Sequence, residues 1–221
     1  LRSADDINER TLAHEAAIHG SLAILKAAIE AGCSVDDPDY YDRRPMHYAA
    51  INGHADCVAH LISQKCDAGS IDDDGNYPFN YAIINGDEQC ARLLLDYDRE
   101  TAYGTPDHPM LILACQMGRE TIVVMLLEAG VEIASNAQGV HPAHVTARAG
   151  FASILKLLLS HGASVDVVDK DLGWTPVFYA ASEGNTACIR LLLEAGCDLD
   201  IEDEAARSPL YYAANEGHME C

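Results

Sequence analysis

The protein has 221 residues, of which 49% are hydrophobic, and 35 acidic side chains against 14 basic ones give it a formal net charge of −21. This charge argues against binding to nucleic acid or to an anionic membrane, and it is compatible either with solubility alone or with a protein partner of basic or mixed surface. No apolar run approaches the roughly 20 residues that a membrane-spanning helix requires.

The most informative pattern is a glycine that recurs every 32 to 34 residues, at Gly20, Gly53, Gly86, Gly118, Gly150, Gly184 and Gly217. An alanine or, once, Thr146 stands four residues before each of these glycines. Columns that repeat in phase mean that one supersecondary unit is copied along the chain. We expect about seven units, at residues 6–38, 39–71, 72–103, 104–135, 136–169, 170–202 and 203–221, the last of them incomplete.

Each unit is expected to contain two helices and an extended connection, and the sixth unit shows this pattern most clearly. Thr175 can cap a first helix that begins at Pro176, and Gly184 can end that helix because glycine takes positive φ without steric cost. A second helix is expected over residues 186–195, and an extended acidic stretch over residues 198–207. Neither helix can bury its apolar face alone, so neighbouring units must stack.

The central units depart from this pattern. Lys65 and Asp98 stand where the second helices of units two and three should end in glycine. The segment DRETAYGTPDHP then leads into a unit that opens with Pro109-Met110 instead of Thr-Pro. We therefore expect an irregular finger over residues 99–108 and a local kink there, which is either a partner site or sequence drift.

Six segments resemble the ankyrin repeat: in chain order RTLAHEAAIHG, RPMHYAAINGH, YPFNYAIINGD, HPAHVTARAG, WTPVFYAASEGN and SPLYYAANEGH. The resemblance covers the whole chain, and it implies that antiparallel helix pairs stack while β-hairpin fingers project from them. It also implies that a concave face of fingertips and inner helices binds protein partners. We therefore expect an all-α fold, an ankyrin-repeat solenoid of about seven helix-turn-helix units, in a single domain over residues 1–221.

A narrower resemblance lies in the order of the atypical units, DINERTLAHEAA, ILACQMG, GVHPAHVTARAG, LGWTPVFYAASEG and SPLYYAANEGHMEC. This order is similar to the ankyrin segment of fungal cyclin-dependent-kinase inhibitors that sense phosphate starvation and that also carry SPX and glycerophosphodiesterase-like domains. It implies an interaction module of a regulatory protein that docks on a cyclin–kinase complex. Two alternatives stay open: a general scaffold or spacer between other domains, and an accessory recognition domain of an enzyme.

No constellation of residues in the sequence points to catalysis, a metal or a cofactor. The string HEAAIH places His14 and His19 five residues apart, so they cannot chelate one ion as an i, i+4 pair does. His14 instead shares a repeat column with His47 and His144, where a structural hydrogen bond to a neighbouring turn is expected. The acidic stretch from Asp198 lacks the glycine and the closing glutamate of a calcium loop. We expect a protein that is not an enzyme.

Seven of the eight cysteines fall in columns that isoleucine, alanine or valine fill in other units, which is typical of small buried hydrophobic side chains. We therefore expect reduced thiols in a protein of the cytoplasm or nucleus. Separately, we expect the protein to be a monomer. Because Leu1 is not methionine and Cys221 falls inside the seventh unit, we expect a piece of a longer protein, and no signal peptide is visible.

Residues that differ between units are the binding candidates, because positions in a shared core would repeat the same residue types. In ankyrin proteins these positions lie on the finger before the Thr-Pro start and just before the glycine that ends the inner helix. Trp174 is expected to be an anchor or, alternatively, to cover its own finger, and the same choice exists for Tyr40 and Tyr41. Mapped onto this chain, the partner-binding candidates are Tyr40, Tyr41, Arg43, Ile51, Asn52, Ile84, Asn85, His108, Met117, Arg148, Leu172, Trp174, Glu183, Arg207 and Glu216.

Overall fold

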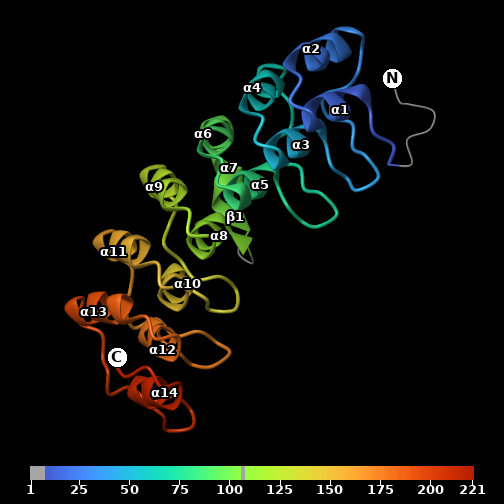
Figure 1. The fold of residues 1–221 in the computed structure, drawn as a ribbon. Coiled ribbons are helices and arrows are strands. Elements are labelled where there is room, and N and C mark those ends of the chain that lie inside the picture. The colour runs from blue at the N-terminus through green and yellow to red at the C-terminus, as the bar shows by residue number, and fades with distance from the viewer. Residues whose placement is uncertain (1–7, 106–107) are drawn as a thin grey trace. The chain divides into compact units, whose positions relative to one another are not determined.

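Helices form nearly all of the regular structure in the part of the chain that the computed structural model describes, residues 8–105 and 108–221, apart from the side chains of residues 102, 103 and 108. The chain divides into two compact units, Leu1–Ala102 and Tyr103–Cys221. Within each unit, short helices alternate between two rows, and loops project from the row that holds the first helix of each pair (Figure 1). We call the first helix of a pair the inner helix, the second the outer helix, and the projecting loop before an inner helix the finger.

The described residues of the first unit form three helix pairs. The inner helices are α1 (Leu12–Ile18), α3 (Pro45–Ile51) and α5 (Pro78–Asn85), and the outer helices are α2 (Leu22–Glu30), α4 (Ala55–Ser63) and α6 (Glu88–Tyr97). Each inner helix packs against its own outer helix, and both rows stack in chain order. The predicted helix pairs and their stacking are therefore confirmed within this unit.

The second unit repeats the arrangement and ends on an inner helix. Its inner helices are α8 (Met110–Gln116), α10 (Pro142–Ala149), α12 (Pro176–Ser182) and α14 (Pro209–Asn215), and its outer helices are α9 (Glu120–Glu128), α11 (Ala152–Ser160) and α13 (Thr186–Glu194). Contacts run from α8 through α10 and α12 to α14, and from α9 through α11 to α13. The fold class is all-α, as predicted.

The irregular finger expected over residues 99–108 is present where it is described. Asp98 does not take the glycine conformation, with φ −137°, and the chain continues into a further helix, α7 (Arg99–Tyr103). Strands β1 (Gly104–Thr105) and β2 (His108–Pro109) then pair antiparallel. Among the described residues, this is the one pair of strands. The other fingers are turns, so the predicted β-hairpin shape is realised as hydrogen-bonded loops.

The inner helices end as the glycine column predicts. Gly184, for example, has φ 72°, and the other six glycines of this column are left-handed as well. Lys65 takes the same conformation with φ 59°, an unfavourable state for a residue with a side chain. One prediction is wrong: the Thr175 hydroxyl does not cap α12. The N–H of Phe178 donates to the Thr175 carbonyl oxygen at 3.0 Å instead, and the buried hydroxyl has no partner among the described residues.

The core lies between the two rows of helices in each unit. Alanines of the column before the glycine are buried, which lets neighbouring inner helices approach closely, and leucines such as Leu61 and Leu158 fill the space toward the outer helices. Each buried leucine contributes about 1.5–3 kcal/mol to the free energy of folding. All eight cysteines are free and seven are buried, and desolvation raises the pKa of Cys90 to about 12. Among residues 8–105 and 108–221, every helix is too short or too polar to cross a bilayer.

Candidate partner-binding surface

A buried carboxylate fixes the backbone of the first finger. Asp39, 5% exposed, accepts hydrogen bonds from the N–H groups of Tyr41 and Arg43, both at 2.9 Å. Its second oxygen accepts a bond of 2.6 Å from the Tyr48 hydroxyl on α3. Because one carboxylate satisfies two backbone donors and a hydroxyl, the loop is held in a single conformation. We call such an aspartate with its tyrosine a finger lock.

Finger locks recur in three other fingers. The hydroxyl groups donate from Tyr81 to Asp72 at 2.5 Å, from Tyr179 to Asp169 at 3.0 Å and from Tyr212 to Asp203 at 2.6 Å. Desolvation, followed by the bond to the aspartate, raises the pKa of Tyr48 and of Tyr179 to about 12. Desolvation opposes ionisation of Asp72, but the bonds from Tyr81 and from the Asn76 N–H hold its pKa below the ordinary value.

The finger before α10 shows what happens when the tyrosine is missing. Asn136 stands in the aspartate column and Val145 in the tyrosine column. The Asn136 side-chain oxygen still accepts from the N–H groups of Gln138 and Val140, at 3.1 and 2.9 Å. This finger therefore lacks both the aspartate charge and the tyrosine hydroxyl of a lock. This is expected, because a buried carboxylate is costly unless its full set of hydrogen-bond donors is present. Sequence reasoning missed the locks, although an aspartate nine or ten residues before a tyrosine marks them.

In three inner helices, a histidine of the repeat column joins the helix to the next finger. Nδ1 of His14 accepts the Thr11 N–H at 3.0 Å, and its Nε2 lies 3.0 Å from the Arg43 carbonyl oxygen. Nε2 of His144 lies 2.8 Å from the Val167 carbonyl oxygen, on the opposite arm of its finger, before Asp169. Both rings are buried, and desolvation lowers their pKa. The predicted structural role of this column is confirmed.

Of the three candidates in the first finger, Tyr40 and Tyr41 are exposed to solvent, whereas Arg43 is bonded within the fold. Tyr40 is 66% exposed and Tyr41 44% exposed, with ring centroids 5.3 Å apart in an edge-to-face contact. Arg43 is engaged within the unit, because its Nε donates to Asp72 at 3.0 Å and its Nη2 to Asp74 at 2.8 Å. The finger therefore displays aromatic rings on a backbone that is already fixed.

Trp174 packs against its own repeat and the next one. Its ring stacks on Phe178 with centroids 5.6 Å apart and meets Tyr212 edge-on at 4.6 Å. Arg207, another candidate, lies with its guanidinium carbon 4.9 Å from the centre of the Tyr212 ring. Leu172, at the tip of the same finger, is 48% exposed. This geometry favours the alternative in which Trp174 covers its finger.

The remaining candidates, apart from His108, lie at the C-terminal ends of inner helices. Asn85 is committed within the fold, since its amide donates to the Ile51 carbonyl oxygen at 2.5 Å, and Arg148 pairs with Glu183 at 3.6 Å. The other exposed or half-buried candidates here are Ile51, Asn52, Ile84, Met117 and Glu216. His108 has its backbone in β2, and its side chain lies outside the described residues.

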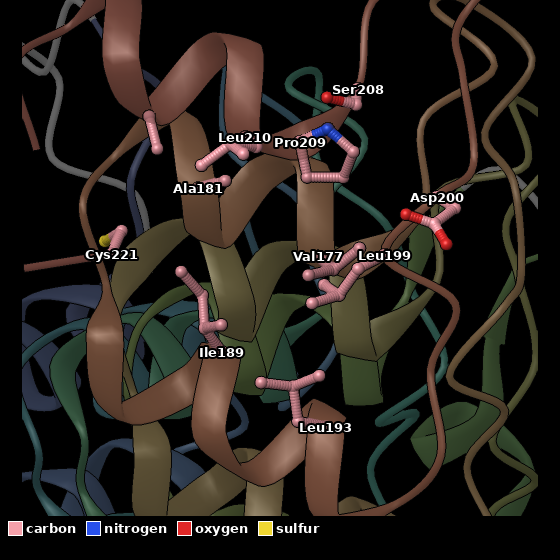
Figure 2. Close-up of a pocket in the computed structure, with 11 residues that line it drawn as sticks. Val177, Ala181, Ile189, Leu193, Leu199, Asp200, Ser208, Pro209, Leu210 and Cys221 are labelled. Atoms are coloured by element: carbon pink, nitrogen blue, oxygen red, sulfur yellow. The ribbon is translucent and has the colours of Figure 1, made fainter.

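An apolar groove of about 250 Å³ opens beside α14. Figure 2 shows Val177, Ile189 and Leu193 facing it from α12 and α13, with Leu210 on the α14 side. Leu210 is 69% exposed, whereas Val177, in the same repeat column, is 1% exposed. The difference arises because α12 packs against α13, while no outer helix follows α14 in the described part of the chain.

Metal-ligand clusters are absent from the described residues: none brings together three or more histidine, cysteine, aspartate or glutamate side chains that could hold an ion. His14 faces the Arg43 carbonyl oxygen, whereas the exposed His19 ring lies 3.7 Å from Glu15.

A family model described as "Ankyrin repeats (3 copies)" matches the chain three times, at residues 1–72, 52–137 and 138–221. The chain belongs to the ankyrin-repeat family. This ankyrin-repeat chain is 40% identical over its whole length to the ankyrin repeat protein nuc-2 of Neurospora crassa, and it spans 21% of the length of that relative.

Solved ankyrin structures share the fold. The human ASB11 ankyrin repeat domain is 26% identical, with a TM-score of 0.82 over 95% of this chain and 96% of that one. The ankyrin repeat domain of Bcl-3, a member of the IkappaB protein family, is 24% identical, with a TM-score of 0.79 over 93% of this chain and 95% of that one, and shows the fold alone. Ankyrin repeats are protein-interaction modules, and the exposed, variable finger and helix-end residues of this chain suit that role.

Proposed function

We propose that this chain is the protein-binding segment of a regulatory protein and that it docks on a cyclin–cyclin-dependent-kinase complex, as part of a phosphate-responsive kinase inhibitor. The observation that carries the binding role is the contrast within each locked finger. The backbone is fixed by a buried aspartate, while side chains such as Tyr40 and Tyr41 stay exposed. A preorganised loop loses little conformational freedom when a partner binds.

The choice of partner is supported by two further points. The order of atypical units resembles fungal cyclin-dependent-kinase inhibitors, and the relative of 40% identity is a Neurospora crassa ankyrin repeat protein. The net charge of −21 favours a partner with a basic or mixed surface, through faster association. We place the encounter in the cytoplasm or nucleus, because free, buried cysteines are typical of a reducing compartment.

The test is a binding titration of the purified chain, as a monomer, against a purified fungal cyclin–kinase complex and against the kinase without its cyclin. We expect saturable binding to the complex that weakens as salt increases, because part of the attraction is electrostatic. Kinase activity measured in the same samples separates docking from inhibition. Absence of binding to the complex at concentrations of about 10 μM, a weak limit for a specific contact, would exclude this partner.

A further inference from the structure

The apolar groove beside α14 is lined by side chains whose counterparts in the other repeats are covered. Leu210, on the α14 side, is 69% exposed. The other six residues of its repeat column are at most 2% exposed: Ala13, Met46, Phe79, Leu111, Ala143 and Val177. Leu193 on the α13 side is 43% exposed, whereas Leu159, one repeat earlier, is partly buried against the core. The groove is therefore made of columns that are otherwise part of the core.

One repeat earlier, the outer helix α13 fills the corresponding space. Cys188 and Leu192 of α13 are fully buried, in one core cluster with Val177 of α12 and Leu155 of α11. Val177 stands in the same repeat column as Leu210. The groove beside α14 thus presents to solvent the kind of surface that an outer helix covers one repeat earlier, as Figure 2 shows for its two sides.

The residues after α14 make the contacts with which an outer helix begins. Asn185, the N-cap of α13, donates from its side-chain amide to the Arg148 carbonyl oxygen at 2.8 Å. His218 stands in the same column, and its Nε2 lies 3.0 Å from the Ser182 carbonyl oxygen, the equivalent acceptor one repeat later. Cys221 then lines the groove and packs against the core of this unit. The N-cap of an outer helix is thus in place at the edge of the groove.

We propose that the groove binds a seventh outer helix, formed by the same polypeptide from Met219 onward. To repeat the buried stripe of α13, this helix carries aliphatic side chains one and four residues after Cys221, in the columns of Ile189 and Leu192. In the nuc-2 relative, the matched segment is 21% of the length, so most of that polypeptide lies outside it. A helix of a partner or of a second copy fits less well, because a helix that continues from His218 is tethered beside the groove at high effective concentration. This inference goes beyond the proposed function and does not depend on the partner.

The experiment compares the chain of 221 residues with the same chain extended by the segment of about twelve residues that follows Cys221 in the longer polypeptide. Native-state hydrogen exchange at the amides of α14 is measured in both. We expect the extension to slow this exchange about tenfold or more, because covering Leu210 and its neighbours stabilises α14. An extension of the same length, with serine at the two aliphatic positions, should leave the exchange unchanged.

Two matched variants separate the groove from other exposed apolar residues. Leu210 lines the groove, whereas Met219 is 94% exposed and lies outside its lining. In the chain of 221 residues, Leu210→Ser and Met219→Ser should each change the exchange of α14 by less than about twofold. In the extended chain, Leu210→Ser should speed this exchange about tenfold, because a buried leucine is then lost, and Met219→Ser should still have little effect.

Equal exchange of α14 with and without the native extension would overturn the proposal, and so would an equal effect of the native and the serine-containing extensions. Protection that appears only as the concentration of the unextended chain rises, without any effect of the extension, would assign the groove to a second copy. Protection that appears only on addition of the cyclin–kinase complex would assign it to the partner. Either result removes this inference, while the proposed function is decided separately by the binding titration.

Discussion

Two fingers of this chain are built on the same aspartate–tyrosine lock but use their aromatic residues in opposite ways. In the first finger, Tyr40 is 66% exposed and touches the neighbouring ring of Tyr41 edge-on. In the finger before α12, Trp174 is half-buried and stacks on Phe178. The lock sets the course of the backbone in both, but the two rings stand at different positions: Tyr40 directly follows the lock aspartate Asp39, whereas Trp174 directly precedes the first turn of α12, as Arg43 and Arg44 precede α3.

The two fingers also differ at the residue of the histidine column. In α12 this column holds Phe178, which offers an apolar face, and Tyr212 of the next repeat closes over the other side of the Trp174 ring. In α3 the column holds His47, whose nitrogens are used by the Arg44 N–H and the Asn76 carbonyl oxygen. An aromatic residue directly before an inner helix, such as Trp174, is therefore covered within the fold when this column holds an apolar ring such as Phe178.

The largest expected effect is on stability at Trp174. Trp174→Ala should lower the free energy of unfolding of the second unit by about 2–4 kcal/mol, because ring contacts with Phe178 and Tyr212 are lost. Tyr40→Ala should change it by less than about 0.5 kcal/mol, since the ring is exposed. Urea unfolding with hydrogen exchange at the amides of α12 and α3 measures both. Equal losses in the two variants would refute the contrast between the fingers.

Acid should destabilise both fingers to a similar extent, because each is held by a buried histidine, and it should therefore reduce the difference between them. His14 contacts the Arg43 carbonyl oxygen in the finger before α3, and His144 contacts the Val167 carbonyl oxygen at the start of the finger before α12. Desolvation lowers the pKa of both histidines below the ordinary value near 6.5. The unfolded chain therefore binds more protons, so stability is full above about pH 6.5 and falls as the pH drops through the folded pKa. We expect lower unfolding midpoints at pH 5 than at pH 7.

The matched control for this pH dependence is His144→Asn. Asn80 occupies the same column in α5 and accepts the Tyr77 N–H at 2.9 Å, so asparagine can keep the local bond without titrating. This variant should lose less stability between pH 7 and pH 5 than the wild type, when unfolding is followed in the second unit. An unchanged pH dependence would show that other groups cause the acid effect.

The smallest expected effect concerns the residue before each inner helix. The Thr11 hydroxyl lies 2.8 Å from Nδ1 of His14, three residues later. The residue three after Thr175 is Phe178, and the Thr175 hydroxyl has no partner among the described residues. Thr11→Val should cost about 1 kcal/mol, and Thr175→Val should be neutral or slightly stabilising. Thermal unfolding of the two variants compares them directly. A clear loss in Thr175→Val would mean that its hydroxyl is bonded after all.

Much of the fold follows from the sequence, because the glycine and alanine columns fix where helices end and where they approach closely. The repeat also predicts the role of the His14 column. The binding surface is harder to predict from the sequence. Whether Trp174 points outward depends on Phe178 and Tyr212, and whether Arg43 is free depends on Asp72 and Asp74 from the next repeat. These are contacts between residues about thirty apart or on separate elements, which residue type alone does not reveal.

The most direct test compares the binding of wild type, Tyr40→Ala and Trp174→Ala to one purified cyclin–kinase complex, with unfolding measured on the same samples. The account predicts that Tyr40→Ala weakens binding about tenfold, or about 1.4 kcal/mol, while the protein stays as stable as wild type. Trp174→Ala should lower the free energy of unfolding. Its affinity for the complex should fall only under conditions in which the second unit begins to unfold. Wild-type affinity in Tyr40→Ala would contradict the claim that the exposed ring of the first finger recognises the partner.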